Sequence, residues 1–322
     1  SKKAKIMSTP VVLVTGGSGL VGHALQDCVR ESPSTNFEFV FLSSKDGDLC
    51  DAEVTEQLFI KYRPTYVLHL AAVVGGIFAN ATYPVDFFTK NITMNNNVLR
   101  SSHLHGVKKT ISCLSTCIFP ADARFPVSEN SLHAGPPYAS HQAYAYAKRM
   151  VDVANRAYFE QYGNLFTSVI PTNIYGPHDN FHLQNSHVIP GLIHKFYLAK
   201  QQGTAVTVAG TGIALRQFIY SRDLAKLLLW ALEHYDDVDP IILCGDPQDE
   251  VPIRTVVHQV ARAMNFTNPI HFDASLPDGQ YKKTASNAKL RSLLPNFTFT
   301  SLEHGISHTV AWFVQNYSTS RH

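Results

Sequence analysis

The chain has 322 residues, of which 45% are hydrophobic and 16% charged, and its 27 basic and 25 acidic side chains give a formal net charge of +2. This length fits one large α/β domain with a smaller domain appended. The near balance of charge, without a long run of Lys or Arg, excludes a dedicated nucleic-acid binder, and no apolar stretch is long enough to span a membrane. The first residues lack the apolar core of a secretory signal and the cysteines are few, so we expect a cytoplasmic protein with free thiols.

Short apolar segments rich in β-branched and aromatic residues alternate with segments of helical periodicity from residue 11 onward. Apolar runs of this kind are typical of strands that are covered on both faces. The expected strands are 11–15, 37–42, 66–70, 110–115 and 166–170, and the expected helices between them are 20–30, 51–62, 88–105 and 143–162. Strand–helix–strand repetition of this length predicts an α/β fold with a doubly wound parallel Rossmann sheet.

The pattern changes after residue 172. Residues 171–187 are dense in Pro, Asn, His and Gly and lack periodicity, which indicates a long functional loop. The expected later elements are helices at 188–202, 223–235, 253–264 and 301–317 and a strand at 241–244. We therefore expect a Rossmann domain over 10–172, to which 217–245 return, and a smaller C-terminal α/β domain for the substrate over 173–216 and 246–317. Residues 1–9 and 318–322 are expected to be flexible.

The sequence TGGSGLVG (15–22) follows the first predicted strand directly and opens a helical segment. Glycines in this spacing permit a tight turn, a close approach of the backbone to a pyrophosphate, and close packing of helix on strand. The helix that follows would point its free N–H groups at that phosphate. We therefore expect a dinucleotide bound by Gly16, Gly17, Ser18, Gly19, Leu20, Val21 and Gly22.

The second predicted strand ends in Ser43, Ser44 and Lys45, without an acidic residue at its tip. An acidic residue there would bind a ribose 2′-hydroxyl and repel a 2′-phosphate. Hydroxyls and a lysine would accept the phosphate, so NADP is the expected cofactor, and an ordinary polar loop is the alternative. Asp48 and Leu49, just beyond, are expected near the adenine.

Tyr144 and Lys148 lie four residues apart in a predicted helix, and therefore on one face of it. A neighbouring ammonium favours the phenolate, so Lys148 is expected to lower the pKa of Tyr144 from its ordinary value of about 10. Such a pair alone is common on solvated helices. However, Ser115 follows the fourth predicted strand at the carboxyl edge, where ligands bind in such sheets. The three residues together predict a site for ketone–alcohol chemistry, with Tyr144 as proton donor.

The glycine motif, Ser115 and the Tyr-x-x-x-Lys helix, in this order, resemble the extended short-chain dehydrogenase/reductase family. Residues 210–223 resemble its nucleotide-sugar segment, in which an arginine, here Arg216, grips a diphosphate. Four further segments, 70–80, 114–120, 171–181 and 186–195, are similar to the members that make GDP-L-fucose.

This resemblance implies a homodimer that uses NADPH on GDP-4-keto-6-deoxy-D-mannose, epimerises carbons 3 and 5 and then reduces the ketone at carbon 4. It places reduction on Ser115, Tyr144 and Lys148, and epimerisation on Cys117 as base and His187 as acid. The implied substrate contacts are Lys195, Arg216 and Asp278. The implied cofactor contacts, besides those given above, are Leu70, Ala71, Ala72, Tyr144, Lys148, Pro171, Thr172, Asn173, Ile174 and His187.

Two departures from the family pattern are visible. Ala209 stands where members often have a tryptophan, and Ser18 stands where some have a phosphate-binding arginine. More of the 2′-phosphate contact is therefore expected from residues 43–45.

Three alternatives accompany this interpretation. His178, His182 and His187 share one loop, but their spacing does not preset a tetrahedral site, so no metal is expected. Another nucleotide-sugar epimerase or a dehydratase is the second alternative, although a dehydratase needs an acid where this chain has Thr116 and Cys117. A non-catalytic NADP-sensing scaffold is the third, and the intact Ser–Tyr–Lys set argues against it. No nucleic acid and no membrane are expected as partners.

Overall fold

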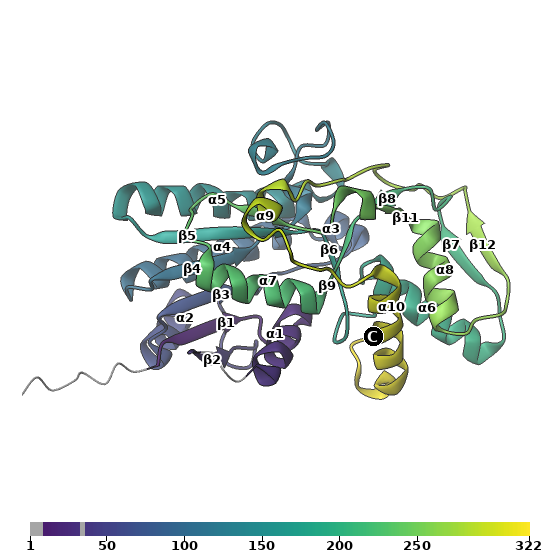
Figure 1. Cartoon of the computed structure of the whole chain (residues 1–322), viewed down its shortest axis with the longest axis horizontal. Coiled ribbons are helices and arrows are strands. Elements are labelled where there is room, and N and C mark those ends of the chain that lie inside the picture. The colour runs from purple at the N-terminus through teal and green to yellow at the C-terminus, as the bar shows by residue number, and fades with distance from the viewer. Residues whose placement is uncertain (1–8, 33–35) are drawn as a thin grey trace, which may run out of the picture.

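The computed structural model of the chain describes residues 9–32 and 36–322, so the expectation for residues 1–8 lies outside the described part. A six-stranded parallel sheet forms the centre of the larger lobe (Figure 1). From one edge to the other, its strands are β10 (Ile241–Leu243), β5 (Leu165–Pro171), β4 (Lys109–Cys113), β3 (Tyr66–His69), β1 (Val11–Thr15) and β2 (Glu38–Phe41). The strand order reverses between β1 and β3, and ligands bind beside such a reversal. The predicted doubly wound sheet is confirmed.

Helices cover both faces of this sheet because alternate residues of each strand point to opposite sides. Val12 and Val14 of β1 pack in an apolar cluster with α1 (Leu20–Glu31) and α7 (Ser221–His234). Leu13 points the other way and packs with α2 (Ala52–Tyr62) and α4 (Pro84–Leu104). The long helix α5 (Gln142–Tyr162) lies beside α4 and carries the predicted Tyr–Lys pair.

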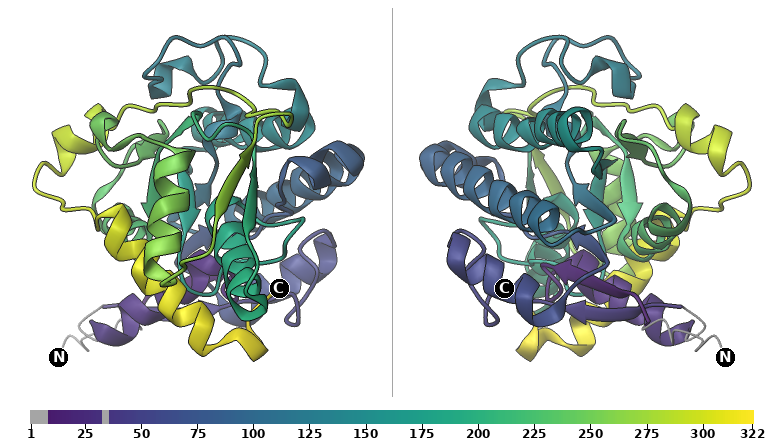
Figure 2. Two further views of the ribbon diagram at one scale, coloured as in Figure 1. Left: turned by 90° about the vertical axis from the view of Figure 1, so that its right-hand side faces the viewer. Right: turned by 90° about the vertical axis from the view of Figure 1, so that its left-hand side faces the viewer.

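A second apolar cluster forms the core of the smaller lobe (Figures 1 and 2). Three helices enclose it with a parallel strand pair, and two shorter strand pairs adjoin them. The helices are α6 (Val188–Gln202), α8 (Ile253–Ala263) and α10 (Leu302–Gln315). The strand pairs are β7 (Val206–Ala209) with β12 (Ile270–Asp273), β8 (Leu215–Arg216) with β11 (Val251–Pro252), and β6 (Asn173–Tyr175) with β9 (Phe218–Tyr220).

Two short helices, α3 (Ile77–Thr82) and α9 (Ala288–Leu293), were not predicted. Each has six residues, which is too short to display helical periodicity. Leu290 of α9 and the residues up to Phe299 pack against the core of the larger lobe, although this stretch was expected in the smaller domain. An ion pair of 2.8 Å between Arg291 and Asp246 helps to hold α9 there.

The last residues of the chain are tied to the 171–187 loop. The ring of Tyr317 stacks on His322 with centroids 4.4 Å apart, and the N–H of Phe181 donates to the carbonyl of Arg321 at 2.7 Å. These backbone and ring contacts place residues 318–322 against the loop, and their flexibility stays a prediction.

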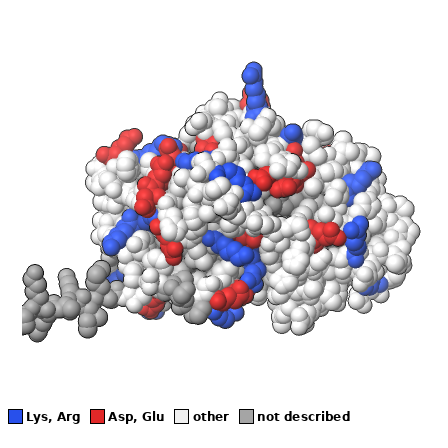
Figure 3. Space-filling view, in the orientation of Figure 1, with Lys and Arg blue, Asp and Glu red and all other residues white. Residues whose placement is uncertain are grey.

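Charged side chains of both signs are interspersed on the face seen in Figure 3. This distribution agrees with the nearly balanced composition. Across residues 9–32 and 36–322, no helix is long and apolar enough to cross a membrane.

Candidate active site

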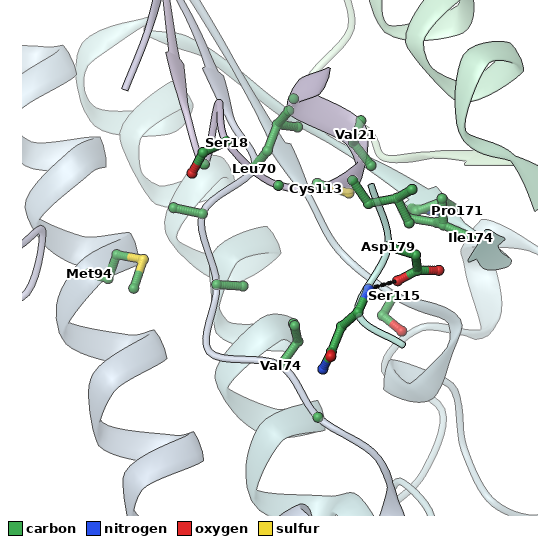
Figure 4. A pocket seen from close by; sticks show the side chains of 18 of the residues that line it. Ser18, Val21, Leu70, Val74, Met94, Cys113, Ser115, Pro171, Ile174 and Asp179 are labelled. Atoms are coloured by element: carbon green, nitrogen blue, oxygen red, sulfur yellow. Dashed lines mark hydrogen bonds between the residues drawn. The ribbon is translucent and has the colours of Figure 1, made fainter. Parts of the chain in front are cut away.

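A pocket of about 760 Å³ opens at the carboxyl ends of β1 to β5. Its walls come from the loops that follow these strands and from the 171–187 loop. In Figure 4, Ser18 and Val21 of the glycine loop, Leu70 after β3 and Ser115 after β4 lie around this space. One cavity therefore brings together the predicted cofactor loop and a predicted catalytic residue.

The glycine loop is too crowded to carry side chains at its key positions. Gly16 has a φ of +70°, and a Cβ there would lie 2.8 Å from the backbone nitrogen of Ala71. A Cβ on Gly22 would overlap the carbonyl group of Gly17. Helix α1 consequently packs tightly on the loop, and Leu20, Val21 and Gly22 of its first turn line the pocket. This cradle fits a pyrophosphate.

The turn after β2 forms the far end of the pocket. The backbone N–H and hydroxyl of Ser43 both donate to the carboxylate of Asp46, at 2.7 and 2.9 Å. Ser43, Ser44, Asp48 and Leu49 line the pocket, as predicted. Lys45 lies in the same turn with an exposed side chain and is not among the lining residues. Its contact with the cofactor stays a prediction.

Buried asparagines behind the pocket were missed by the sequence analysis. Asn91 holds the loop after β3 by accepting from the N–H of Val73 and donating to its carbonyl, both at 3.0 Å. His69 bridges Thr15 and Asn95 at 2.7 and 2.9 Å. In the sequence Asn91 and Asn95 look like the polar face of a solvated helix. Only their tertiary contacts show that they position the residues behind the pocket.

Ser115, Tyr144 and Lys148 all line the same end of the pocket. Ser115 caps a short 3-10 helix directly after β4. Lys148 donates from Nζ to the carbonyl of Cys113 at 2.9 Å, and its Nζ lies 6.0 Å from the centroid of the Tyr144 ring. The structure therefore brings the three predicted reductive residues together.

The protonation of Tyr144 differs from the expectation. Burial raises the pKa of Tyr144 well above its usual range, and the nearby Cys117 and Cys113 thiols raise it further. Burial also lowers the pKa of Lys148. The expected lowering of the Tyr144 pKa is thus wrong here, because burial of the phenol raises it instead. A phenol that stays protonated remains a competent proton donor.

Cys117 and His187 approach the catalytic end from different elements. Cys117 lies in the 3-10 helix after Ser115 and behind the pocket wall, while His187 immediately precedes α6 and lines the pocket. Burial raises the pKa of Cys117, although the Ser115 hydroxyl and the Lys283 and Lys148 charges oppose it. Burial lowers the pKa of His187. Burial therefore favours the thiol form of Cys117 and the neutral imidazole of His187.

The three predicted substrate residues lie in the smaller lobe. Lys195 on α6 donates to the carbonyl of Thr207 at 3.0 Å. Asp278 accepts from the N–H and hydroxyl of Thr211, at 2.8 and 2.6 Å, and so fixes the turn that precedes β8. Arg216 on β8 is largely buried, and this burial lowers its pKa. None of the three lines the pocket described above.

Lys283 was also missed by the sequence analysis. Burial and the neighbouring Arg216 lower its pKa to about 8, and its charge acts on Cys117. Lys283 therefore interacts through its charge with both the predicted substrate residue Arg216 and the predicted base Cys117. In the sequence it is one of two consecutive lysines, and nothing in that pattern indicates a role at the site.

The three histidines of the 171–187 loop do not gather. His178 stacks on His23 with ring centroids 3.9 Å apart, and His182 accepts from the N–H of Gln184 at 3.2 Å. In the part of the chain that the structure describes, no group of three metal-ligating side chains is found.

Most of the predicted cofactor residues line the pocket, and several unpredicted ones join them. The predicted residues that line it are Gly16, Ser18, Gly19, Leu20, Val21, Gly22, Ser43, Ser44, Asp48, Leu49, Leu70, Ala71, Ala72, Tyr144, Lys148, Pro171, Thr172, Asn173, Ile174 and His187. Gly17 is not among them, because it faces Phe41. The unpredicted ones include Val74, Gly75, Met94, Asp179, Asn180, Asn185, Ser186 and Arg321.

Comparison with known proteins agrees with this arrangement. Residues 12–245 match the NAD dependent epimerase/dehydratase family. The chain is 53% identical over 314 residues to the GDP-L-fucose synthase of Dictyostelium discoideum, with 98% of each chain covered. It is 49% identical over 317 residues to the probable GDP-L-fucose synthase of Drosophila melanogaster, covering 96% of this chain and 99% of that one. The crystal structure of a GDP-L-fucose synthetase from Naegleria fowleri bound to NADP superposes with a TM-score of 0.94 at 50% identity, covering 100% of this chain and 98% of the other.

Proposed function

The chain belongs to the NAD dependent epimerase/dehydratase family, and from this premise we propose that it converts GDP-4-keto-6-deoxy-D-mannose into GDP-L-fucose with NADPH. The observation that carries the proposal is that Ser115, Tyr144 and Lys148 line the same pocket as the glycine loop. The similarity to proteins named GDP-L-fucose synthase over nearly the whole chain supports the choice of substrate.

NADPH, when bound, supplies the hydride for reduction at carbon 4. The residues of this chain supply the proton and the hydrogen bonds at the ketone oxygen in that step. The Tyr144 phenol, kept protonated by its raised pKa, donates a proton to the ketone oxygen, and the Ser115 hydroxyl hydrogen-bonds the same oxygen. Lys148, anchored on the carbonyl of Cys113, places a positive charge beside the phenol that loses the proton.

Epimerisation removes a proton from a carbon next to the ketone and returns one on the opposite face. Loss of that proton places negative charge on the ketone oxygen, which Ser115 and Tyr144 are positioned to stabilise. Cys117 acts as the base and His187 as the acid in our assignment. The charges of Lys148 and Lys283 favour the thiolate that this assignment needs, whereas burial opposes it. The pH dependence of solvent-deuterium incorporation at carbons 3 and 5 separates this assignment from the reverse one.

We further propose a homodimer in the cytoplasm. Helices α4 and α5 pack together and expose apolar side chains, among them Val85, Phe88, Met150, Val153 and Phe159. Apolar side chains gathered on adjacent helices are typical of a protein–protein interface. All five cysteines are free, which suits a reducing compartment. Light scattering of the purified chain tests the dimer, and a monomeric mass would contradict it.

The activity is tested by incubating the chain with NADPH and GDP-4-keto-6-deoxy-D-mannose. We expect loss of the reduced-nicotinamide absorbance and formation of GDP-L-fucose. Absence of net NADPH consumption with interconversion of sugar epimers would instead indicate a 4-epimerase.

A further inference from the structure

The cofactor pocket contains few cationic side chains for a ligand with several phosphate charges. Among the described residues that line it, only Lys148 and Arg321 are Lys or Arg. Lys148 belongs to the catalytic end, where it contacts the carbonyl of Cys113. The glycine loop carries Ser18, and Lys45 lies outside the pocket. Besides the catalytic Lys148, Arg321 is therefore the one Lys or Arg among the described residues that line the pocket.

Arg321 reaches this position from the far end of the chain. Its backbone pairs with Asn180, and its carbonyl accepts from the N–H of Phe181 at 2.7 Å. One guanidinium nitrogen donates to the carbonyl of His178 at 2.6 Å. A guanidinium carries five N–H donors, so the others stay available to a ligand.

The surroundings of Arg321 place it beside the first turns of α1. Its charge acts on His23, which is in the first turns of α1, and on His178, whose ring stacks on that of His23 at 3.9 Å. The N-terminus of α1 is where a pyrophosphate binds in this fold, whereas the 2′-phosphate binds at the end of β2. Asp179 is the nearest lining acid, and burial raises its pKa to about 7, so it opposes the guanidinium charge only weakly.

We propose that Arg321 is a cofactor-binding residue whose guanidinium contacts the pyrophosphate of the nicotinamide dinucleotide. The segment 317–322 thereby carries a cation from the smaller lobe across to the glycine loop of the larger one. This inference rests on NADP as the cofactor.

The test is a titration of the whole chain with NADPH, NADH and adenosine 2′-phosphate, which carries the 2′-phosphate but no pyrophosphate. In Arg321→Gln we expect NADPH and NADH to bind more weakly by the same factor, roughly 10- to 100-fold, since one charge-assisted contact is lost. Adenosine 2′-phosphate should bind as it does to the unmodified chain. Arg321→Lys should recover part of the loss, because the charge is kept.

Arg262→Gln is the matched control, since Arg262 lies in the smaller lobe and pairs with Glu303 at 3.1 Å, away from the pocket. It should leave all three affinities unchanged. Unchanged NADPH affinity in Arg321→Gln, with the unmodified chain binding NADPH, would overturn the inference but leave the cofactor assignment intact. A loss confined to NADPH and adenosine 2′-phosphate would also overturn it, since it would place Arg321 at the 2′-phosphate. Failure of the unmodified chain to bind NADPH would instead contradict the proposed function.

Discussion

Tyr144 is a buried phenol, and this burial raises its pKa well above the usual range, which favours the protonated form that a proton donor needs. Replacing it by Phe removes the proton donor but keeps the ring that packs edge-on against Phe87. We expect Tyr144→Phe to slow ketone reduction by about 10²–10⁴-fold while NADPH affinity and thermal stability change little. Single-turnover NADPH oxidation measures this. The control is Tyr146→Phe on the same helix, which should react normally, and a normal rate in Tyr144→Phe would show that another group donates the proton.

Cys117 is a thiol at rest, because burial raises its pKa. If it is the base, the reactive thiolate fraction increases about tenfold per pH unit below that pKa, so solvent-deuterium incorporation at carbons 3 and 5 should rise with pH. Cys117→Ser should abolish incorporation and retain NADPH binding, whereas the control Cys50→Ser should behave as the parent chain. Mass spectrometry of the recovered sugar gives the result.

A pH-independent exchange rate around neutrality would contradict this assignment. Because burial lowers the pKa of His187, a neutral imidazole already predominates there, and a flat profile would make His187 the base. His187→Gln separates the two further, since it should leave exchange at one carbon only if Cys117 removes the proton.

The turn after β2 decides between NADPH and NADH. Ser44 lines the pocket. The N–H and hydroxyl of Ser43 both donate to the carboxylate of Asp46, and Lys45 is not among the residues that line the pocket. We expect NADPH to be preferred by roughly 10- to 100-fold in kcat/KM, and Ser44→Ala to reduce that preference. Lys45→Ala should reduce it less. Steady-state rates with both cofactors measure the ratio, and equal kcat/KM values would reject the 2′-phosphate contact.

The start of α1 depends on the absence of a side chain at Gly22. A Cβ there would overlap the carbonyl of Gly17, so Gly22→Ala must push α1 away from the glycine loop. We expect a loss of about 1–3 kcal/mol in unfolding free energy together with weaker NADPH binding. Gly163→Ala is the control, because Gly163 ends α5 at a φ of +70° with open space around it. Its replacement should lower the unfolding free energy but leave NADPH affinity unchanged. Unchanged NADPH affinity in Gly22→Ala would contradict the role of close packing at this loop.

Elements that repeat an apolar pattern were predictable, and those held by side-chain contacts were not. The strand β1 and the helix α6 have the predicted bounds, because each presents a clear period. Helix α4 begins at Pro84, four residues before the predicted start, because proline is favoured in the first turn and hides the boundary. The short helices α3 and α9 give no periodic signal.

At the site, residues required by the local backbone conformation were easier to predict than residues whose role depends on contacts between distant parts of the sequence. The glycine loop shows its function in sequence, because only glycine fits there. The pKa of Tyr144 was predicted in the wrong direction, since burial is a property of the whole fold. Arg321 was missed because nothing local connects the last residues with the loop at Asn180.

In the molecule as a whole, the residues predicted for the cofactor and those predicted for the substrate lie mostly on different lobes. The larger lobe holds the pocket with the glycine loop and the Ser–Tyr–Lys set, and the smaller lobe carries Lys195, Arg216 and Asp278. His187 and Arg321 reach the pocket from the smaller lobe side. The proposed reaction therefore draws on residues of both lobes.

The most direct test of this account is the identity of the sugar made by the purified chain from GDP-4-keto-6-deoxy-D-mannose and NADPH in deuterated water. We predict GDP-L-fucose that carries solvent deuterium at carbons 3 and 5, with one NADPH oxidised for each molecule formed. A 6-deoxy sugar without deuterium at those carbons, or no turnover despite NADPH binding, would contradict the account.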